Sequence, residues 1–252
     1  MPPVLDIRFH GTLKDLLHPR HRRPGRVAYT LDRRASIKDI IESLRIPHTE
    51  IGRITAGERD VTLAWVPEEG GRVDVFPLAA PVDPTRPTLL RPETVEEVRF
   101  LADVNVGKLA TLLRMAGMDT ATAPGLDDRG LAEKGAAEGR ILLSRNRDLL
   151  KRGRVVHGHL VRSQDPREQL AEVLALYDLA GKTRPFSRCL RCNTLLQPVA
   201  KAAILHRLQP LTRKYYHHFH ICPACRRIYW RGSHRLHMER LLATLGHTDG
   251  HH

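Results

Sequence analysis

The sequence predicts a multidomain protein with three consecutive parts: a small α+β domain, a parallel α/β domain, and a basic segment that carries all four cysteines. The hydrophobic pattern changes near Arg99 to an alternation of strands and helices, and a proline-rich stretch comes before that change. The cysteines form two Cys-x-x-Cys pairs in the last part of the chain. With 252 residues, 41% of them hydrophobic, the chain can form two or three small cores.

The first domain, residues 1–82, has the element order of a β-grasp fold: strand, strand, helix, then further strands. Runs of apolar and β-branched residues predict its strands, which are residues 4–9, 26–31, 61–66 and 73–76. Ser36 is expected to cap the helix, with Asp39 in a capping-box-like position and Pro47 after the helix end. The apolar stripe of this helix is Ile37, Ile40, Ile41 and Leu44.

Residues 83–97 are predicted to be a linker, because the stretch from Ala79 to Pro87 carries three prolines that a helix or a central strand does not tolerate. The second domain is expected at residues 98–180. Its predicted strands are residues 100–102, 118–123, 140–144 and 155–161. Its predicted helices run from Val106 to Gly117, from Asp127 to near Gly139, and from Pro166 to Leu179. This alternation predicts a parallel sheet with right-handed crossovers.

The charge of the chain favours a polyanionic partner. The 41 Lys and Arg residues exceed the 28 Asp and Glu residues by 13. Between Gly181 and Arg240, thirteen Lys and Arg residues face the single acid Glu239. Such a concentration predicts a nucleic acid partner, although a merely solvated surface is an alternative.

Nothing in the sequence predicts a membrane protein. No apolar run approaches the roughly 18 residues of a membrane-spanning helix. The residues from Met1 to Asp6 lack the basic start and apolar stretch of a signal peptide. We therefore expect a cytoplasmic protein with no membrane partner.

The four cysteines predict a structural zinc site. They are Cys189, Cys192, Cys222 and Cys225, with 29 residues between the two pairs. Paired Cys-x-x-Cys units in an intracellular protein indicate a metal site, and four thiolates close a tetrahedral zinc site. The alternatives are an iron–sulfur centre, or replacement of one ligand by His217, His218 or His220. We expect a zinc ribbon at residues 181–245.

The basic segment also carries aromatic residues, and together they predict contacts with RNA. The candidate phosphate contacts are Arg213, Lys214, Arg226, Arg227 and Arg231. The aromatic residues are Phe186, Tyr215, Tyr216, Phe219, Tyr229 and Trp230. Aromatic faces can stack on bases while cations meet phosphates. Alternatively, these aromatic side chains fill the small core of the ribbon.

In the second domain, acidic residues lie directly after predicted strands or at the start of a predicted helix. Asp103 follows the first strand, Asp127 and Asp128 precede the second helix, and Asn146 and Asp148 follow the strand at residues 140–144. In open α/β sheets, the carboxyl edge is where ligands bind. Carboxylates gathered there could hold magnesium or manganese and support phosphodiester hydrolysis. Alternatively, Asp103 and Asp128 only cap helices.

Several segments resemble one known family. They are the run from Phe100 to Asp119, the phrase from Glu138 to Arg145, and the cysteine segments Arg188–Asn193 and Cys222–His234. In this order, over about residues 98–242, they resemble the Mut-seven C-terminal RNase family, a PIN-like nuclease domain with a zinc-ribbon tail. The N-terminal domain is similar to the ubiquitin-like domain that precedes it in many members.

This resemblance implies a PIN-like fold and metal-dependent RNA cleavage at Asp103, Asp128 and Asp148, with Asp127 competing for the second position. The family usually has Thr-Arg-Asp where this chain has Ser144-Arg145-Asn146. An Asn carbonyl can ligate a cation but adds no negative charge, so Asn146 would weaken the site. The N-terminal domain runs into the linker without the free Gly-Gly tail of sulfur carriers, which argues against thiocarboxylate chemistry.

The sequence therefore favours a metal-dependent endoribonuclease that acts on structured RNA such as tRNA or rRNA, alone or in the ribosome. The competing hypothesis is a non-catalytic tRNA- or ribosome-binding protein on a degenerate PIN-like fold, which Asn146 and the basic tail support. A third hypothesis, a protein–protein adaptor built on the ubiquitin-like domain, does not explain the charge.

Overall fold

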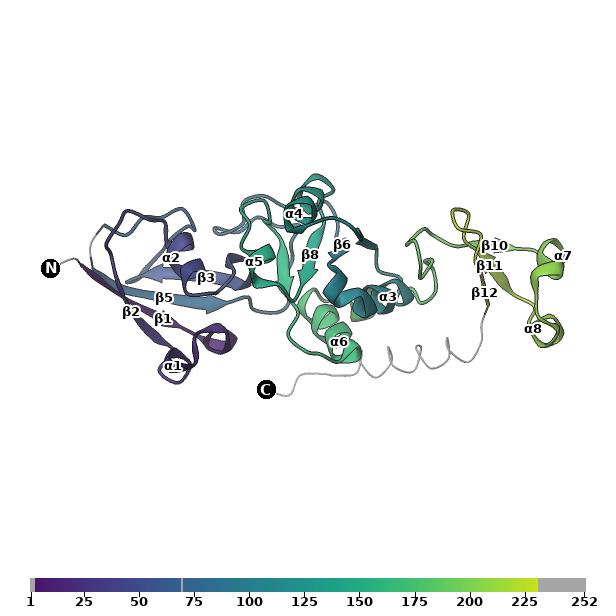
Figure 1. The fold of residues 1–252 in the computed structure, drawn as a ribbon, viewed down its shortest axis with the longest axis horizontal. Coiled ribbons are helices and arrows are strands. Elements are labelled where there is room, and N and C mark those ends of the chain that lie inside the picture. The colour runs from purple at the N-terminus through teal and green to yellow at the C-terminus, as the bar shows by residue number, and fades with distance from the viewer. Residues whose placement is uncertain (1–2, 69, 231–252) are drawn as a thin grey trace. The chain divides into compact units, whose positions relative to one another are not determined.

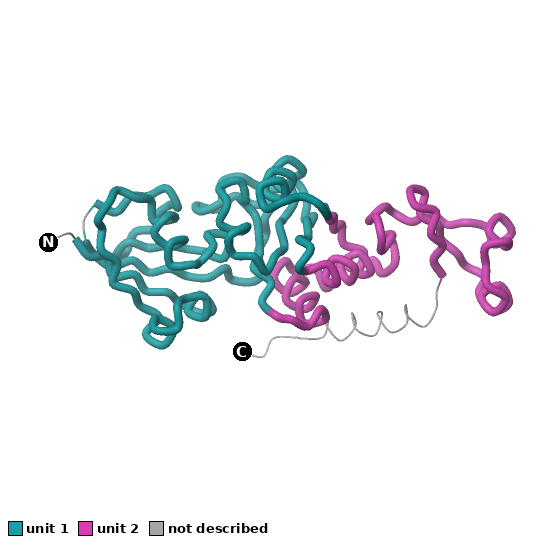
Figure 2. Tube along the Cα trace, in the orientation of Figure 1, with its two compact units in different colours: residues 1–105, 123–162 teal, residues 106–122, 163–252 magenta. Residues whose placement is uncertain are grey.

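A computed structural model describes residues 3–68 and 70–230 (Figure 1). The chain forms two compact units (Figure 2). Unit 1 contains residues 1–105 and 123–162, and unit 2 contains residues 106–122 and 163–252. Among the described residues, no helix has the length and apolar character needed to span a membrane.

The N-terminal part of unit 1 is a five-stranded mixed sheet in the order β2-β1-β5-β3-β4 (Figure 1). The strands are β1 (Val4–Phe9), β2 (Arg26–Thr30), β3 (Ile51–Ala56), β4 (Arg59–Asp60) and β5 (Gly71–Pro77). The first strand pairs in parallel with β5 and antiparallel with β2. Its inward side chains Leu5, Ile7 and Phe9 are buried, as the alternating pattern predicts. This mixed sheet with its helix α2 is the expected β-grasp fold.

Helix α2 (Ile37–Ser43) confirms the predicted cap: the Ser36 side chain accepts a hydrogen bond from the Asp39 amide at 3.1 Å. A shorter helix, α1 (Pro19–Arg22), precedes β2. The predicted strand at residues 61–66 is wrong. The carbonyls of Leu63 and Trp65 accept hydrogen bonds from the first two amides of α2, Lys38 and Ile37, so this segment satisfies donors at the start of the helix. Residues 61–66 form no strand.

The C-terminal part of unit 1 contains the parallel strands β6 (Phe100–Ala102), β8 (Ile141–Ser144) and β9 (Gly158–Leu160), which pair in that order. All residues of these strands are buried. Two helices accompany them, α4 (Asp128–Ala137) and α5 (Arg147–Leu150). The parallel sheet predicted from the sequence is confirmed, and α5 is an element that the sequence pattern did not predict.

Unit 1 joins its two sheets through the buried carboxylate of Glu50. Glu50 ends a 3₁₀ turn (His48–Glu50) and accepts a hydrogen bond from the Leu160 amide of β9 at 2.8 Å. Arg162 pairs with the same carboxylate at 3.3 Å. Burial raises the pKa of Glu50, but the hydrogen bonds and charges of His159, Leu160 and Arg162 outweigh this and hold the pKa below its ordinary value.

The stretch predicted as a linker, residues 83–97, contains no helix or strand. It is nevertheless attached to unit 1 through Arg91, which is buried. The guanidinium of Arg91 donates to the carbonyl oxygens of His48, Thr49 and Ile51 at 3.2, 2.8 and 2.8 Å. His48 in turn contacts the Val155 carbonyl through Nε2 at 2.7 Å. Arg91 therefore fixes the segment whose last residue, Glu50, reaches β9.

Unit 2 contains helices α3 (Gly107–Met115) and α6 (Pro166–Leu176), the short strand β7 (Thr120–Thr122), and the C-terminal ribbon (Figure 2). The two helices pack through the buried side chains Leu109, Leu113, Leu170, Val173 and Leu174. The ribbon is an antiparallel sheet of β10 (Gln197–Val199), β11 (Phe219–Ile221) and β12 (Ile228–Trp230). Between β10 and β11 lie α7 (Lys201–Ile204) and α8 (Pro210–Tyr215).

The remaining short turns are 3₁₀ helices at Gly11–Leu16, Val104–Val106, Ala180–Lys182 and Leu205–Arg207. The helices of the second domain are shorter than predicted at their C-termini. The predicted helix at residues 166–179 ends at Leu176, and the one from Asp127 ends at Ala137. Gly117, with a φ of 92°, has the left-handed conformation expected after α3.

We predict that Glu50→Gln lowers the free energy of unfolding by about 3 kcal/mol, because it leaves Arg162 and His159 without their buried anion. Glu58→Gln, at an exposed position of the same domain, is the matched control. Chemical denaturation measures both. A Glu50 variant as stable as the control would contradict the role assigned to this carboxylate.

The same carboxylate gives a pH dependence. Its pKa is lower in the folded than in the unfolded state, so its contribution to stability is complete above the unfolded value of about 4.3 and is lost as the pH falls through the folded value. The stability difference between wild type and Glu50→Gln should therefore shrink in acid.

Candidate functional site

Asp103 lies at the carboxyl edge of the parallel strands, directly after β6, and is buried. Three donors face its carboxylate. The Val104 amide donates to Oδ1 at 2.6 Å, and the Asn105 side-chain amide and the Ser144 hydroxyl donate to Oδ2 at 2.6 and 2.7 Å. Hydrogen bonds of this kind fix the orientation of a carboxylate. Asp103 is therefore held rigidly at this edge.

Ser144, the last residue of β8, connects the ends of two strands. Its hydroxyl donates to Asp103 and accepts the backbone amide of Asn146 at 2.9 Å. Asn105 reinforces this link, because its Oδ1 accepts the Arg145 amide at 3.1 Å while its Nδ2 contacts both Asp103 and Ser144. Sequence reasoning missed Asn105 and Ser144 as site residues. The signal for Asn105 was its position two residues after a candidate acid, at a strand end.

Asn146 binds two partners with the two halves of its amide. Its Oδ1 accepts the backbone amides of Asp148 and Leu149 at 2.9 and 3.4 Å and so caps α5. Its Nδ2 donates to Asp128 Oδ2 at 3.0 Å. The carbonyl oxygen that could have ligated a cation is thus occupied by the helix start, and the NH2 group faces the acid.

Asp128 and Asp127 have different positions at the start of α4. Asp127 is the N-cap, and its Oδ1 accepts the Gly130 amide at 2.8 Å. Asp128 is the first helical residue and contacts Asn146. The structure therefore connects Asp128, and not Asp127, to Asp103 through Asn146 and Ser144.

Asp148 lies apart from this chain of contacts. Its side chain is 81% exposed and forms an ion pair with Lys151 at 2.6 Å. The Lys151 ammonium and the charge of Arg45 hold the pKa of Asp148 below its ordinary value. The structure thus joins Asp103, Asp128 and Asn146 into one network and leaves Asp148 at its margin.

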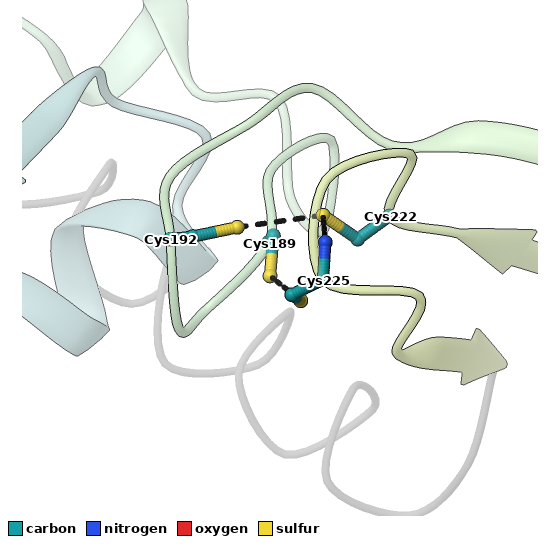
Figure 3. A group of neighbouring side chains, drawn as sticks. All are labelled: Cys189, Cys192, Cys222 and Cys225. Atoms are coloured by element: carbon teal, nitrogen blue, oxygen red, sulfur yellow. Dashed lines mark hydrogen bonds between the residues drawn. The ribbon is translucent and has the colours of Figure 1, made fainter.

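The four cysteines form the clearest candidate metal centre (Figure 3). Among the described residues, they form the only group of three or more His, Cys, Asp or Glu side chains whose ligand atoms all lie within 4.8 Å of one another. The Sγ atoms of Cys189 and Cys225 are 3.5 Å apart, and those of Cys192 and Cys222 are 3.4 Å apart. A tetrahedral zinc thiolate site has sulfur separations of about 3.8 Å. The donor set could therefore bind a metal such as zinc.

The two Cys-x-x-Cys turns have the same backbone geometry. In each turn the residue after the second cysteine is left-handed, with φ of 68° at Asn193 and 61° at Arg226. The amides of these two residues donate to the carbonyls of Cys189 and Cys222, both at 2.9 Å. This shared geometry makes two equivalent loops that present their thiols to one point.

The surroundings of the thiols lower the pKa of two ligands, Cys189 and Cys192, and so favour their thiolates. Burial raises the pKa of Cys192, but hydrogen bonds from Thr194 and from the neighbouring thiols outweigh it and lower the pKa to about 6. The Tyr229 hydroxyl lies 3.1 Å from Cys189 Sγ and also accepts the Leu190 amide at 3.1 Å. Tyr229, expected as a base-stacking residue or as core, therefore supports the cysteine site.

The first cysteine turn is attached to the helical part of unit 2. Arg114 of α3 is buried and donates to the carbonyls of Leu190 and Arg191, both at 3.0 Å. Asn193 accepts the Thr120 amide at 3.1 Å and donates to Asp119 at 2.9 Å. These contacts hold the turn in place beside β7.

The basic candidates lie on the ribbon surface. Arg213, Lys214, Arg226 and Arg227 are all exposed. Arg231 lies outside the described residues. Phe219 is buried in the ribbon core with Ile204 and Leu208, so the core interpretation is confirmed for Phe219. Tyr215 is 63% exposed, so part of its ring could stack on a base. Trp230 is 38% exposed and contacts the rings of Tyr216 and Phe219.

Two family models match the chain. The model described as Mut7-C RNAse domain matches residues 98–242, and the model described as Mut7-C ubiquitin matches residues 2–83. No curated protein and no solved structure matches the chain. The two models match the order of domains that the sequence motifs indicate.

We predict that the purified protein contains about one equivalent of zinc per chain and that Cys222→Ser removes it. Tyr229→Phe should weaken zinc binding by 10-fold or more, because it removes the hydroxyl beside Cys189, whereas Tyr215→Phe should not. Elemental analysis and competition with a zinc chelator measure this. Iron in place of zinc, or four freely titratable thiols in the folded protein, would overturn the assignment.

Proposed function

This chain belongs to the Mut7-C RNAse family, and we propose that it is a divalent-metal-dependent endoribonuclease, a hydrolase that acts on structured RNA such as tRNA or rRNA, alone or in the ribosome. The observation that carries the proposal is the connected network of Asp103, Ser144, Asn146 and Asp128 at the carboxyl edge of the parallel strands. This is the edge at which open α/β sheets bind their ligands.

The network fits a hydrated magnesium or manganese ion. Magnesium is usually bound by one or two carboxylates, several waters and substrate phosphates, and Asp103 and Asp128 are two carboxylates tied to one edge. When bound, such a cation activates water and offsets the charge of the phosphodiester. Asp148 would add a third carboxylate after release from Lys151, with Asn146 as a neutral neighbour.

The chain's own residues orient this site. Ser144 and Asn105 both donate to Oδ2 of Asp103, and the Val104 amide donates to Oδ1, so the carboxylate would not have to reorganise when a substrate arrives. Asn146 does the same for Asp128 through one hydrogen bond. In this proposal Asp103 and Asp128 are the catalytic residues, and Ser144, Asn105 and Asn146 are positioning residues.

RNA binding in this proposal rests mainly on the ribbon. Arg213, Lys214, Arg226 and Arg227 would contact phosphates, as would Arg231 outside the described residues. Lys214 lies over the ring of Tyr215, with its Nζ 5.3 Å from the ring centroid, so a cation and an exposed aromatic face are adjacent. That combination suits a nucleic acid strand.

One observation favours a second candidate function, RNA binding without cleavage. The Asn146 NH2 group occupies a place beside Asp128 where the family usually has a third carboxylate. A donor at this position replaces one negative charge that would attract a cation. A protein with this site could bind tRNA or the ribosome through its basic surface and leave the RNA intact.

We predict that Asp103→Asn abolishes divalent-metal-dependent RNA cleavage, lowering the rate by 100-fold or more, while RNA affinity changes little. Asp127→Asn is the matched control: Asn is as good an N-cap as Asp, and Asp127 lies outside the network. Incubation of each variant with tRNA and rRNA plus magnesium or manganese measures cleavage. Full activity of Asp103→Asn, or equal losses in both variants, would overturn the assignment.

Asn146→Asp separates the two candidate functions. It keeps the cap of α5 but places a second carboxylate beside Asp128, so added magnesium should raise the melting temperature more than in wild type. If wild type binds RNA without cutting it and Asn146→Asp cuts, the chain is an RNA-binding protein on a nuclease fold. If both variants bind RNA and neither cuts, the endoribonuclease proposal fails.

We predict that Arg226→Ala/Arg227→Ala weakens RNA binding by on the order of tenfold and makes the logarithm of the affinity depend less steeply on salt, because fewer counterions are released. Arg33→Ala/Arg34→Ala removes the same charge from an exposed loop of the N-terminal domain and is the control. Fluorescence anisotropy over a salt series measures both, with zinc content checked in parallel. Salt-independent binding would remove the electrostatic argument.

A further inference from the structure

Unit 1 brings together four arginines from distant parts of the sequence. Arg22 and Arg45 come from the ubiquitin-like domain, Arg147 directly follows Asn146 at the start of α5, and Arg162 follows β9. Arg22 and Arg45 are exposed, and Arg147 and Arg162 are half-buried. The four are called the arginine patch below.

Backbone carbonyls of the ubiquitin-like domain hold this patch together. Arg147 Nη1 donates to the Leu16 carbonyl at 2.7 Å and approaches the Arg45 carbonyl at 3.5 Å. Arg22 Nε donates to the neighbouring Leu17 carbonyl at 3.0 Å. Arg162 Nη1 donates to the Thr12 carbonyl at 3.2 Å. Arg162 also uses Nη2 for its ion pair with Glu50 at 3.3 Å. Because a guanidinium has five N–H donors, these contacts still leave donors on Arg22, Arg147 and Arg162 for an anion.

The charges in the patch repel one another. Burial, and then the positive charges of Arg45, Arg22 and Arg162, lower the pKa of Arg147, and the nearby acid Glu50 offsets only part of this effect. Grouped like charges destabilise a folded protein, so a bound anion would relieve a cost that the free protein carries. Backbone carbonyls fix the guanidiniums of Arg22, Arg147 and Arg162 but contribute no negative charge.

The patch adjoins the candidate catalytic edge. Arg147 lies between Asn146 and Asp148 in the sequence, and the charge of Arg45 acts on Asp148. A ligand held by these arginines would therefore lie near Asp148 and the start of α5, the helix that Asn146 caps. Guanidinium groups bind phosphates in pairs of parallel hydrogen bonds, and a row of them fits a chain of phosphodiesters.

We propose that Arg22, Arg45, Arg147 and Arg162 form a binding site for the phosphodiester backbone of RNA, so that the ubiquitin-like domain holds the substrate beside the catalytic edge. This inference rests on the proposed RNA function. It assigns to the ubiquitin-like domain a direct part in RNA binding.

The test compares Arg22→Ala/Arg45→Ala with the control Arg33→Ala/Arg34→Ala, which removes the same charge from the same domain. The probe is a fluorescent single-stranded RNA, titrated over a salt series without added magnesium or manganese. The patch variant should bind on the order of tenfold more weakly, and its salt slope should fall by about 1.4, or 0.7 for each lost phosphate contact. The control should bind like wild type.

Arg22→Lys/Arg45→Lys keeps both charges and should recover most of the affinity and of the salt slope. Equal melting temperatures in all variants would show that none has lost its fold. Equal binding by the patch variant and its control would overturn the inference and leave the ribbon as the RNA-binding surface. Wild type that binds neither this probe nor tRNA would overturn the proposed function as well. If the patch binds an acidic peptide but not RNA, the inference that it binds phosphodiesters is also overturned.

Discussion

The buried carboxylate of Glu50 is the interaction on which the arrangement of unit 1 depends. A carboxylate inside a protein is costly unless hydrogen bonds and opposite charges satisfy it, and Glu50 meets this condition only with groups from the other sheet, the Leu160 amide and Arg162. The pairing is therefore specific as well as stabilising. It fixes the end of β9 against the ubiquitin-like domain, and the contact of Arg147 with the Leu16 carbonyl follows from the same packing. The four arginines of the patch come together because the two sheets of unit 1 pack in this way.

A second constraint acts at the carboxyl edge. Since parallel strands end at one edge, Asp103 after β6 and Ser144 at the end of β8 become neighbours although 40 residues separate them in the chain. Asn146 then has to cap α5 and to satisfy Asp128 at once. An aspartate would cap the helix equally well but would repel Asp128 unless a cation lay between them. Asn146 therefore avoids this repulsion when no metal ion is bound, but the edge has one negative charge fewer than it would have with an aspartate at this position.

Local signals in the sequence predicted local structure. The Ser36 cap, the apolar stripe of α2, the strand after Arg140 and the two cysteine turns all follow from residues that are close in the chain. The strand at Ile51–Ala56 was missed because its pairing shifts register between Ile51 and Arg53, which breaks the alternation, and the apolar run at residues 61–66 was mistaken for a strand. At the candidate site the sequence predicted Asp103, Asp128, Asp148 and Asn146, and the structure connects three of them, Asp103, Asp128 and Asn146, in one network. The sequence did not reveal the contacts of Ser144, Asn105, Glu50 and Tyr229, because their long-range partners lie 39 to 112 residues away and depend on tertiary packing.

The charges around the edge determine what can approach it. An acidic edge alone would repel a polyanion, but each of these acids has donors or cations beside it. Asp103 accepts three N–H or O–H groups, Asp128 accepts the Asn146 amide, and Lys151 and Arg45 are the cations near Asp148. If the arginine patch binds phosphates as proposed, a phosphodiester backbone could lie near this edge even before a cation binds. Under both candidate functions the RNA would then contact the ribbon and the patch. The two candidate functions differ in whether the site would hold a divalent cation that supports cleavage, and Asn146, which donates to Asp128, lacks the negative charge that an aspartate would add there.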